Sequence, residues 1–535
     1  MIKVVYEDIA LGAKIDFQPT ISEMTQFSKL QQIKEDVDFP NYGNPIESFS
    51  VILDGSVKAL PSNPENIGVW SESVASESGV FDSPILLTFS AVELYTSSGL
   101  SLMFDTQNNI HPKNVTVTWY RGNEQLSTKD FVVDSAFYFF KNKVENYNKV
   151  VFEFESMNTP KTRLRLRSVE FGIKVNFGGD ELRAVNVSQK SNLISSELPI
   201  SSTVFVADSK LGVDFSFQEA QPVKTYFNNE LQSTTFVTKA KRQSKSIWNV
   251  STEDYIGILE NTPFVGGIYS NKNAVELLTE IFTKADVPFY ISSDFDDETV
   301  SGWIPYTNCR DALMQVAFAI CASVSTACSD VVNVIKPTQE IKTITLDSIM
   351  QGLAVEEEAV VTTVSVTSHR YKAIDEETIA YEADESGTGG AIQVKFVEPL
   401  HDLEITNGII VLSGANYALI NAFDGCVLTG KKYKDITQTK SQKNVNVSTL
   451  KENAVSITSA TLVSRSNVDK VLENCYNYFT RNKTVKAKII ESGAPTKVLD
   501  LVEVETDFSG VFEKRITEQR YSLVGNILVK ESVML

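Results

Sequence analysis

The three histidines and five cysteines are the side chains from which a metal or nucleophilic site would be built. His111, His369 and His401 lie far apart, and none falls in an H-x-H or H-E-x-x-H pattern that would place two imidazoles on one face of an element. The cysteines form no C-x-x-C pair and have no histidine nearby; they are Cys309, Cys321, Cys328, Cys426 and Cys475. We therefore predict no metal site, and we place the histidines at strand ends or in loops.

One acidic run invites a calcium interpretation. Asp294-Phe295-Asp296-Asp297-Glu298 has the carboxylate density of a calcium loop, but Thr299 stands where an EF-hand needs glycine. Pro305 stands where the twelfth-position glutamate would be. We interpret the run as a solvated acidic turn.

Signatures of phosphate binding and acyl transfer are also missing. Gly387, Gly389 and Gly390 lack the Lys-Ser/Thr that follows a P-loop, and the chain has no G-x-S-x-G elbow. With 68 Asp and Glu residues, the sequence cannot nominate a carboxylate pair for glycoside cleavage. We predict no catalytic, cofactor-binding or metal-binding residue, no cofactor, and a protein that is not an enzyme.

Two tryptophans are the candidate contacts for a carbohydrate. Trp70 and Trp119 lie among short alternating strands, and an exposed indole can stack on a sugar ring. In a β-sandwich, such tryptophans are also frequent core residues. Both interpretations remain open from the sequence.

Composition restricts the class of protein and its partners. The formal net charge is −19, whereas a nucleic-acid-binding surface needs clustered lysine and arginine, so we expect no direct nucleic-acid binding. The longest mostly apolar run, 312–322, is shorter than the roughly 20 residues needed to span a bilayer, so we expect no membrane span. The odd cysteine count indicates reduced thiols, and the N-terminus lacks a signal-peptide pattern. Both predict assembly in the bacterial cytoplasm.

The chain must fold as several domains that are mostly β-sheet. Its 535 residues predict three or four cores, and its hydrophobic content of 42% excludes wholesale disorder. Short alternating strands fill residues 48–175, and a polar helical candidate covers residues 21–33. Strands continue through 181–245, restart after 341, and return after a helix that begins at Ser466.

Residues 247–337 form one α+β unit that packing alone explains. Apolar residues recur at helical spacing in 271–287, and again after Thr307, a natural N-cap. The buried faces are predicted to comprise Ala274, Leu277, Leu278, Ile281 and Phe282 in the first helix, and Ala312, Leu313, Val316, Ala317 and Ile320 in the second. Gly302 and Pro305 provide the bend between strand and helix.

The succession from Ile247 to Pro337 resembles the central module of bacteriophage tail and baseplate hub proteins. Leu501–Gly510 with Gln519–Gly525 resembles their closing β-barrel, although Leu499-Asp500 replaces the usual Gly-Asp. Residues 48–175 resemble a carbohydrate-binding-module or discoidin-like sandwich. The motifs that carry this second resemblance are Leu53-Asp54-Gly55-Ser56, Gly68-Val69-Trp70-Ser71, Gly99–Asp105, Arg163–Leu166 and Val169–Gly172.

These resemblances imply a mainly β multidomain fold with an N-terminal β-sandwich, hub-like β-barrels and a small α+β module. The expected segments are an arm or linker (1–45), the sandwich (46–174), a barrel part (175–245), the α+β module (246–340), a second barrel part (341–461) and a C-terminal helix with barrel strands (462–535). Residues 175–245 are expected to share a barrel with 341–461, and the C-terminal strands to form the other barrel.

The implied function is that of a virion structural protein in the tail baseplate of a phage or of a contractile, bacteriocin-like particle. As a hub, it would join the tail tube to the baseplate, associate as a trimer around the tail axis, and contact other baseplate proteins. The alternative is a tail-tip receptor-binding or cell-wall-glycan-binding protein, with Trp70 and Trp119 as glycan contacts. A secreted glycosidase is a further rival; it predicts an export signal and a carboxylate-lined cleft.

Overall fold

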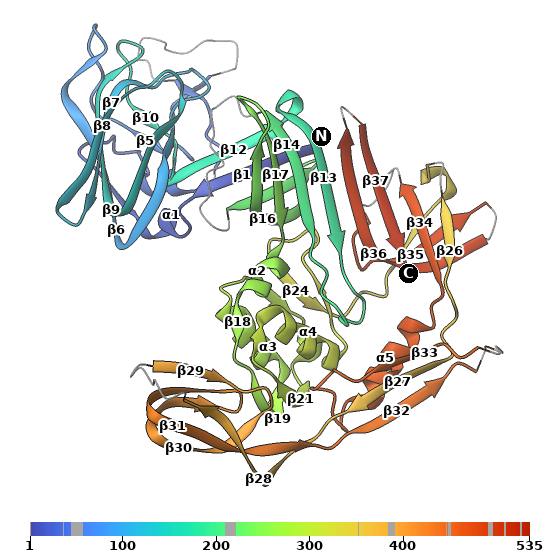
Figure 1. Ribbon diagram of the computed structural model, residues 1–535. Helices are drawn as coiled ribbons and strands as arrows, with labels where there is room; N and C mark the ends of the chain where they lie inside the picture. Colours follow the sequence, from blue (N-terminus) through green and yellow to red (C-terminus); the bar gives the residue numbers. More distant parts are fainter. Residues whose placement is uncertain are drawn as a thin grey trace. The chain divides into compact units, whose positions relative to one another are not determined.

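The computed structural model describes residues 2–35, 37–43, 57–208, 221–350, 353–383, 391–445, 447, 451–489, 496–507, 510–524 and 527–535, with the backbone alone at 180, 523–524 and 527–529. The chain forms two compact units, one of residues 5–176 and one of 177–535 with the first four residues. The predicted mainly β multidomain fold class is confirmed (Figure 1). The motif Leu53–Ser56 and the glycines at 387–390 lie outside the described residues.

The 5–176 unit is built on a six-stranded sheet, ordered β11-β6-β9-β7-β8 with β2 beside β6. Strands β5 and β10 form a separate pair, as do β3 and β4. The bounds are β2 (Gln18–Ile21), β3 (Tyr42–Gly43), β4 (Lys58–Ala59), β5 (Val69–Trp70), β6 (Val80–Met103), β7 (Pro112–Arg121), β8 (Glu124–Val132), β9 (Phe137–Met157), β10 (Arg165–Leu166) and β11 (Ser168–Glu170), with α1 (Ala13–Asp16) and the 3₁₀ helix η1 (Leu30–Lys34). Strands β1 (Ile2–Ile9) and β12 (Gly172–Gly178) carry the chain between the units.

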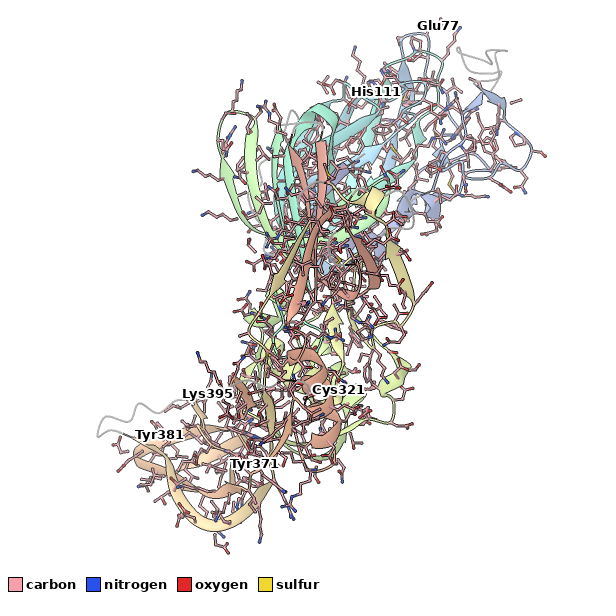
Figure 2. All side chains as sticks on the ribbon, turned by 90° about the vertical axis from the view of Figure 1, so that its right-hand side faces the viewer. Glu77, His111, Cys321, Tyr371, Tyr381 and Lys395 are labelled. Atoms are coloured by element: carbon pink, nitrogen blue, oxygen red, sulfur yellow. The ribbon has the colours of Figure 1, made fainter. Side chains whose placement is uncertain are left out.

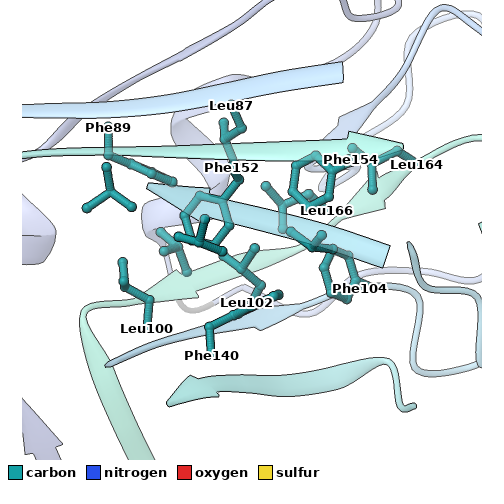
Figure 3. Packing of buried hydrophobic residues seen from close by; sticks show 14 of the residues in the cluster. Leu87, Phe89, Leu100, Leu102, Phe104, Phe140, Phe152, Phe154, Leu164 and Leu166 are labelled. Carbon is teal, nitrogen blue, oxygen red and sulfur yellow. The ribbon is translucent and has the colours of Figure 1, made fainter. Parts of the chain in front are cut away.

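Aromatic packing holds this unit together. Phe89 from β6 and Phe152 from β9 meet edge to face, and Leu164 and Leu166 belong to the same core (Figure 3). Edge-to-face pairs add stabilisation beyond the area they bury. Phe17, within the stretch predicted as an arm, is fully buried in the same core.

The helix predicted over residues 21–33 is wrong. Of that range, only Ile21 lies in a strand, β2 (Gln18–Ile21), which pairs with residues 87–90 of β6, and residues 22–29 form turns and irregular backbone. Leu30–Lys34 makes only one short 3₁₀ turn. Local helical preference is a weak signal, and here backbone bonds to distant segments override it. The N–H groups of Thr25 and Lys29 donate to the carbonyls of Trp70 and Gly68.

The second unit contains a large sheet ordered β15-β16-β17-β14-β13-β36-β37-β34-β26, with β35 beside β36 and β25 beside β35. Its strands are β13 (Leu182–Lys190), β14 (Ser202–Asp208), β15 (Pro222–Phe227), β16 (Glu230–Arg242), β17 (Ile247–Glu253), β25 (Ile341–Ile344), β26 (Ala354–Glu357), β34 (Lys483–Ile489), β35 (Leu501–Thr506), β36 (Gly510–Val524) and β37 (Ile527–Met534). Two 3₁₀ helices, η2 (Gly179–Glu181) and η4 (Leu346–Ser348), lie in the connections.

Strand partners in this sheet differ from the expectation. Residues 182–190 pair antiparallel with β36 near the C-terminus, not with strands from 363–457. Among the described strands, no sheet closes on itself, so the expected barrels are open sheets in this chain. Alternating patterns predict that a strand exists but do not specify its partner, because many strands share the same pattern.

The α+β module lies below this sheet in Figure 1. It comprises α2 (Tyr255–Asn261), β18 (Pro263–Phe264), β19 (Gly267–Asn273), α3 (Ala274–Lys284), β20 (Phe289–Ile291), η3 (Ser293–Phe295), β21 (Thr299–Ile304), β22 (Thr307–Asn308), α4 (Cys309–Ile320), β23 (Ser323–Ser325) and β24 (Val332–Ile335). Two of its helices, α3 and α4, match the prediction from the sequence, whereas α2 was not predicted. The ten residues predicted to form the buried helix faces are all buried. The cap of α4 is Asn308 rather than Thr307, because the Asn308 side chain accepts the Asp311 N–H at 2.7 Å.

A further layer joins β27 (Thr363–Ser368), β32 (Gln438–Lys443) and β33 (Ala454–Ile457) to α5 (Val468–Phe479). The helix predicted to begin at Ser466 therefore starts two residues later. Val468, Val471, Leu472 and Cys475 on one face of this helix are buried. None of the helices in the described ranges combines the length and apolar content of a bilayer-spanning helix.

Asp254 caps α2 from a buried position. Its carboxylate accepts the Ile256 N–H at 3.1 Å, the Ser201 N–H at 3.1 Å and the Thr326 hydroxyl at 2.6 Å. Burial nevertheless raises its pKa to about 6. Because the folded-state pKa lies above the unfolded value, the fold favours the protonated form. The contribution of Asp254 to stability is therefore greatest at low pH and falls as pH rises towards and through 6.

We expect Asp254→Asn to reveal this pH dependence in urea unfolding of the full chain. Wild-type protein should lose about 1 kcal/mol relative to the variant between pH 5 and pH 7, within a total near 3 kcal/mol over the whole titration. Asp296→Asn, at an exposed carboxylate, is the matched control and should show no such trend. A wild-type-to-variant difference that is the same at both pH values would contradict the expectation.

Candidate functional site: an open sheet edge

The structure does not bring the histidines together. Both ring nitrogens of His369 are hydrogen-bonded: Nδ1 lies 2.7 Å from Asp435 Oδ2, and Nε2 lies 3.0 Å from the Thr458 carbonyl oxygen. His401 contacts the Ile374 carbonyl at 3.2 Å, and His111 the Pro112 carbonyl at 2.9 Å. Within the described ranges, no group of three or more His, Cys, Asp or Glu side chains is placed to hold a metal ion.

Both candidate glycan contacts are covered. Trp70 and Trp119 are each 0% exposed. The Trp70 ring packs 3.9 Å from the Arg165 guanidinium, and Trp119 belongs to the aromatic core of the 5–176 unit. Neither ring offers an exposed face on which a sugar could stack, so glycan contact by either residue would require it to be uncovered first.

A separate four-stranded antiparallel sheet in the second unit has a long edge strand. Its strands are β28 (Tyr371–Glu382), β29 (Ala391–Lys395), β30 (Leu400–Gly414) and β31 (Tyr417–Asp435). Figure 2 labels Tyr371 and Tyr381 on β28 and Lys395 on β29. Strands β28 and β29 lie on one side of β31, and β30 pairs along the other side. Among the described strands, only β31 pairs with β30, so the outer side of this 15-residue strand is an edge.

The tip of the β30–β31 hairpin is fixed to the α+β module by a buried amide. Asn416 donates to the carbonyls of Val265 and Ile304, both at 2.7 Å, and its oxygen accepts the Trp303 indole N–H at 2.7 Å. Its side chain thus uses both donors and its acceptor. The edge strand is consequently held at one end by a rigid anchor.

The two halves of β30 differ in their charge and in their content of apolar residues. The first half carries Asp402 and Glu404, and inserted charges of this kind discourage pairing with another strand. The second half, Gly408–Gly414, has no charge and consists largely of Ile, Val and Leu. Ile409, Val411 and Leu412 are 54, 55 and 57% exposed. We call Gly408–Gly414 the open edge, because its backbone and side chains are both available to a further strand.

Charges gather on the same sheet away from the open edge. Lys431 pairs with Asp375 at 3.1 Å and Lys432 with Glu376 at 2.7 Å, between β31 and β28. The hydrogen bond from Lys432 lowers the pKa of the Glu376 carboxyl, and it raises that of Lys432 itself. These pairs lie in solvent and contribute little to stability, but they keep this part of the sheet hydrophilic.

For the residues of the open edge, the sequence predicts a strand and nothing more. Gly408–Leu412 has β-branched residues without a charge, which predicts a strand but not whether it is central or at an edge. The buried role of Asn416 had no sequence signal beyond a turn residue. Both features depend on which strands pair.

No family model matches this chain, and no curated protein matches it. Solved structures similar to it include a tail protein from Neisseria meningitidis MC58 (9% identity, TM-score 0.44, covering 66% of this chain and 92% of that one). Two prophage tail proteins are also similar. The MuSo2 43 kDa protein from Shewanella oneidensis has 8% identity and a TM-score of 0.42, covering 68% of this chain and 94% of that one. The protein gp18 from Listeria monocytogenes EGD-e has 10% identity and a TM-score of 0.38, covering 67% of this chain and 90% of that one. These scores are too low to carry an argument about function.

Proposed function

We propose that this chain is a structural component of the tail baseplate of a phage or phage-like contractile particle, of the hub type, and that it joins the tail tube to the baseplate by associating with its own copies. It would assemble in the bacterial cytoplasm and act within the tail. The proposal rests on the resemblance of residues 247–337 to the hub module. The structural observation that carries the self-association is the open edge on β30, held in place through Asn416.

Sheet geometry indicates how copies would join. Strands β28 and β30 flank β31, and the outer side of β28 also has no pairing strand among those described. Because both run antiparallel to β31, they are parallel to each other, so β30 of one copy can continue the sheet against β28 of the next. Head-to-tail contacts of this kind form a ring when the rotation from one copy to the next closes, whereas β30 against β30 would give only a dimer. A trimeric ring around the tail axis is the arrangement we propose.

The double variant Ile409→Lys/Val411→Lys tests this association. Lysines on an edge strand oppose strand addition, and both residues are exposed, so the chain itself should fold as before. In multi-angle light scattering and native mass spectrometry, we expect wild-type protein near three times the 59.3 kDa chain mass. The variant should associate at least about tenfold more weakly, since one buried apolar anchor is worth about 1.4 kcal/mol or more.

Val511→Lys is the matched control, because Val511 is 61% exposed and lies on β36, outside the four-stranded sheet. It should associate like wild type. Wild-type protein that stays monomeric at tens of micromolar, or a double variant that assembles normally, would contradict the assembly mode. Electron microscopy of intact particles tests the location: density for this chain below the tail tube is expected, and its absence from the particles would overturn the tail assignment.

A further inference from the structure

A groove runs along the polar face of α5. Its cavity of about 360 Å³ is lined from the helix and the turn after it by Lys470, Glu473, Asn474, Asn477 and Arg481, residues at helical spacing on one face. The opposite face of α5 packs into a hydrophobic core. The facing wall comes from the segment after β24 and from β36. Cys321 at the end of α4, labelled in Figure 2, also lines the groove.

The groove concentrates positive charge in an acidic protein. Lys336, Lys470, Arg481 and Arg515 line it, against the single carboxylate of Glu473. This is a local excess of three positive charges in a chain whose formal net charge is −19. Such reversal of sign within a recess attracts anionic partners selectively, since the rest of the surface repels them.

Arg515 is held in place by hydrogen bonds, whereas Lys336, Lys470 and Arg481 are exposed at the surface of the groove. Arg515 donates to the carbonyls of Thr338 and Leu499, both at 2.8 Å, and to the Gln339 side chain at 3.2 Å, all of which are neutral acceptors. Lys470 pairs with Glu298 at 2.5 Å in an exposed position. In the described part of the chain, no carboxylate lies within ion-pair distance of Lys336, Arg481 or Arg515.

Nearby groups show that the positive charges repel one another. Burial lowers the pKa of Arg515, and the neighbouring Arg481 lowers it further. Burial also lowers the pKa of Lys514, and Arg481 and Lys483 add to that effect. Glu513 and Asp500 offset part of this repulsion at Arg515. An anion in the groove would relieve the remainder.

The length of the groove selects among anions. From Lys470 to Arg481 the helix face extends about 16 Å, which is the span of about five residues of extended peptide. A small anion would contact one or two of the cations, whereas an extended chain with several carboxylates can meet all of them. Asn474 and Asn477 between the charged positions can bond to a peptide backbone.

We propose that the α5 groove binds an extended acidic peptide segment of a partner protein. Carboxylates of the peptide pair with Lys336, Arg481 and Lys470, and the fixed Arg515 guanidinium receives another at the inner wall. This site is independent of the open edge on β30 and does not require self-association.

Fluorescence anisotropy of the full chain with a labelled five-residue polyglutamate peptide tests the groove. Binding is expected for polyglutamate and not for polyglutamine, and it should weaken as salt rises from about 0.05 to 0.3 M. Lys336→Glu/Arg481→Glu should weaken binding at least about tenfold, because two attractions become repulsions. Lys241→Glu, an exposed charge reversal on β16, should bind like wild type.

Two results would overturn the proposal. One is equal binding by the double charge-reversal variant and wild type when both have the same circular dichroism and unfolding midpoint. The other is complete displacement of the peptide by an equal concentration of inorganic phosphate, which would make the groove a site for small anions. Retention of the peptide in the presence of phosphate supports a peptide site.

Discussion

Asp105→Ala is expected to destabilise the 5–176 unit by about 3–5 kcal/mol, the cost of leaving a buried charge without its partner. Asp105 and Arg165 are 1% and 0% exposed, and their side chains meet at 2.7 Å. Arg167 is a second buried cation that Asp105 stabilises, and burial already lowers its pKa to about 10. Removing the Asp105 carboxylate therefore leaves two buried guanidinium groups without the negative charge that offsets their desolvation.

Urea unfolding of the full chain, followed by tryptophan fluorescence and by hydrogen exchange of peptides from β6 and β9, measures this effect. Asp82→Ala is the control, because Asp82 is an exposed carboxylate on the same sheet and should change stability by less than about 0.5 kcal/mol. Adding Arg165→Met to Asp105→Ala should restore part of the loss, since a hydrophobic side chain tolerates burial. Equal stabilities for the Asp105 and Asp82 variants would refute the buried-pair account.

Gly302→Ala is expected to destabilise the second unit by at least about 3 kcal/mol. Gly302 has φ +148°, and a Cβ atom built there would lie 2.1 Å from the Thr461 carbonyl oxygen. That carbonyl belongs to backbone tied to β21, because the Trp303 N–H donates to it at 3.3 Å and the Thr461 hydroxyl donates to the Trp303 carbonyl. Neither the Thr461 backbone nor β21 can move away from the other without breaking these hydrogen bonds.

Gly267 provides a closely matched control for this experiment. It lies on β19, the strand paired with β21, has φ +158°, and has nothing within 4 Å of a built Cβ. Gly267→Ala should therefore show only the backbone cost of the added side chain, about 1–2 kcal/mol. The difference between the two variants in thermal and urea unfolding measures the contact with Thr461. Equal effects would show that the contact is unimportant.

Predictions from the sequence succeeded where a local pattern decides the structure. The buried faces of α3 and α4 follow from apolar spacing alone, because a helix has one periodicity and few alternatives. The cap of α4 was misplaced by one residue, since Thr307 and Asn308 can both accept a backbone N–H. The helix predicted over 21–33 failed because the backbone there bonds to distant segments instead; the Thr25 N–H, for example, donates to the Trp70 carbonyl, 45 residues away.

The candidate site was less predictable than the fold. A strand near Gly408–Leu412 was evident from its composition, yet its position at an open edge depends on the pairing of β31. The pairing of residues 182–190 with β36 joins segments more than 300 residues apart, and the sequence pattern of neither strand specifies the other as its partner. The groove along α5 required its polar face to meet Lys336 and Arg515, which come from distant parts of the chain.

The amino-acid sequence by itself determined the mainly β class, helices α3 and α4 of the α+β module, and the net negative charge. These properties depend on composition and on periodicity within a few residues. Tertiary structure alone decided that Trp70 and Trp119 are covered, that Asp105 faces Arg165, and that β30 is left with a free side. Each of these is a contact, or the lack of one in the described strands, between segments distant in the chain, and short-range patterns carry no information about it.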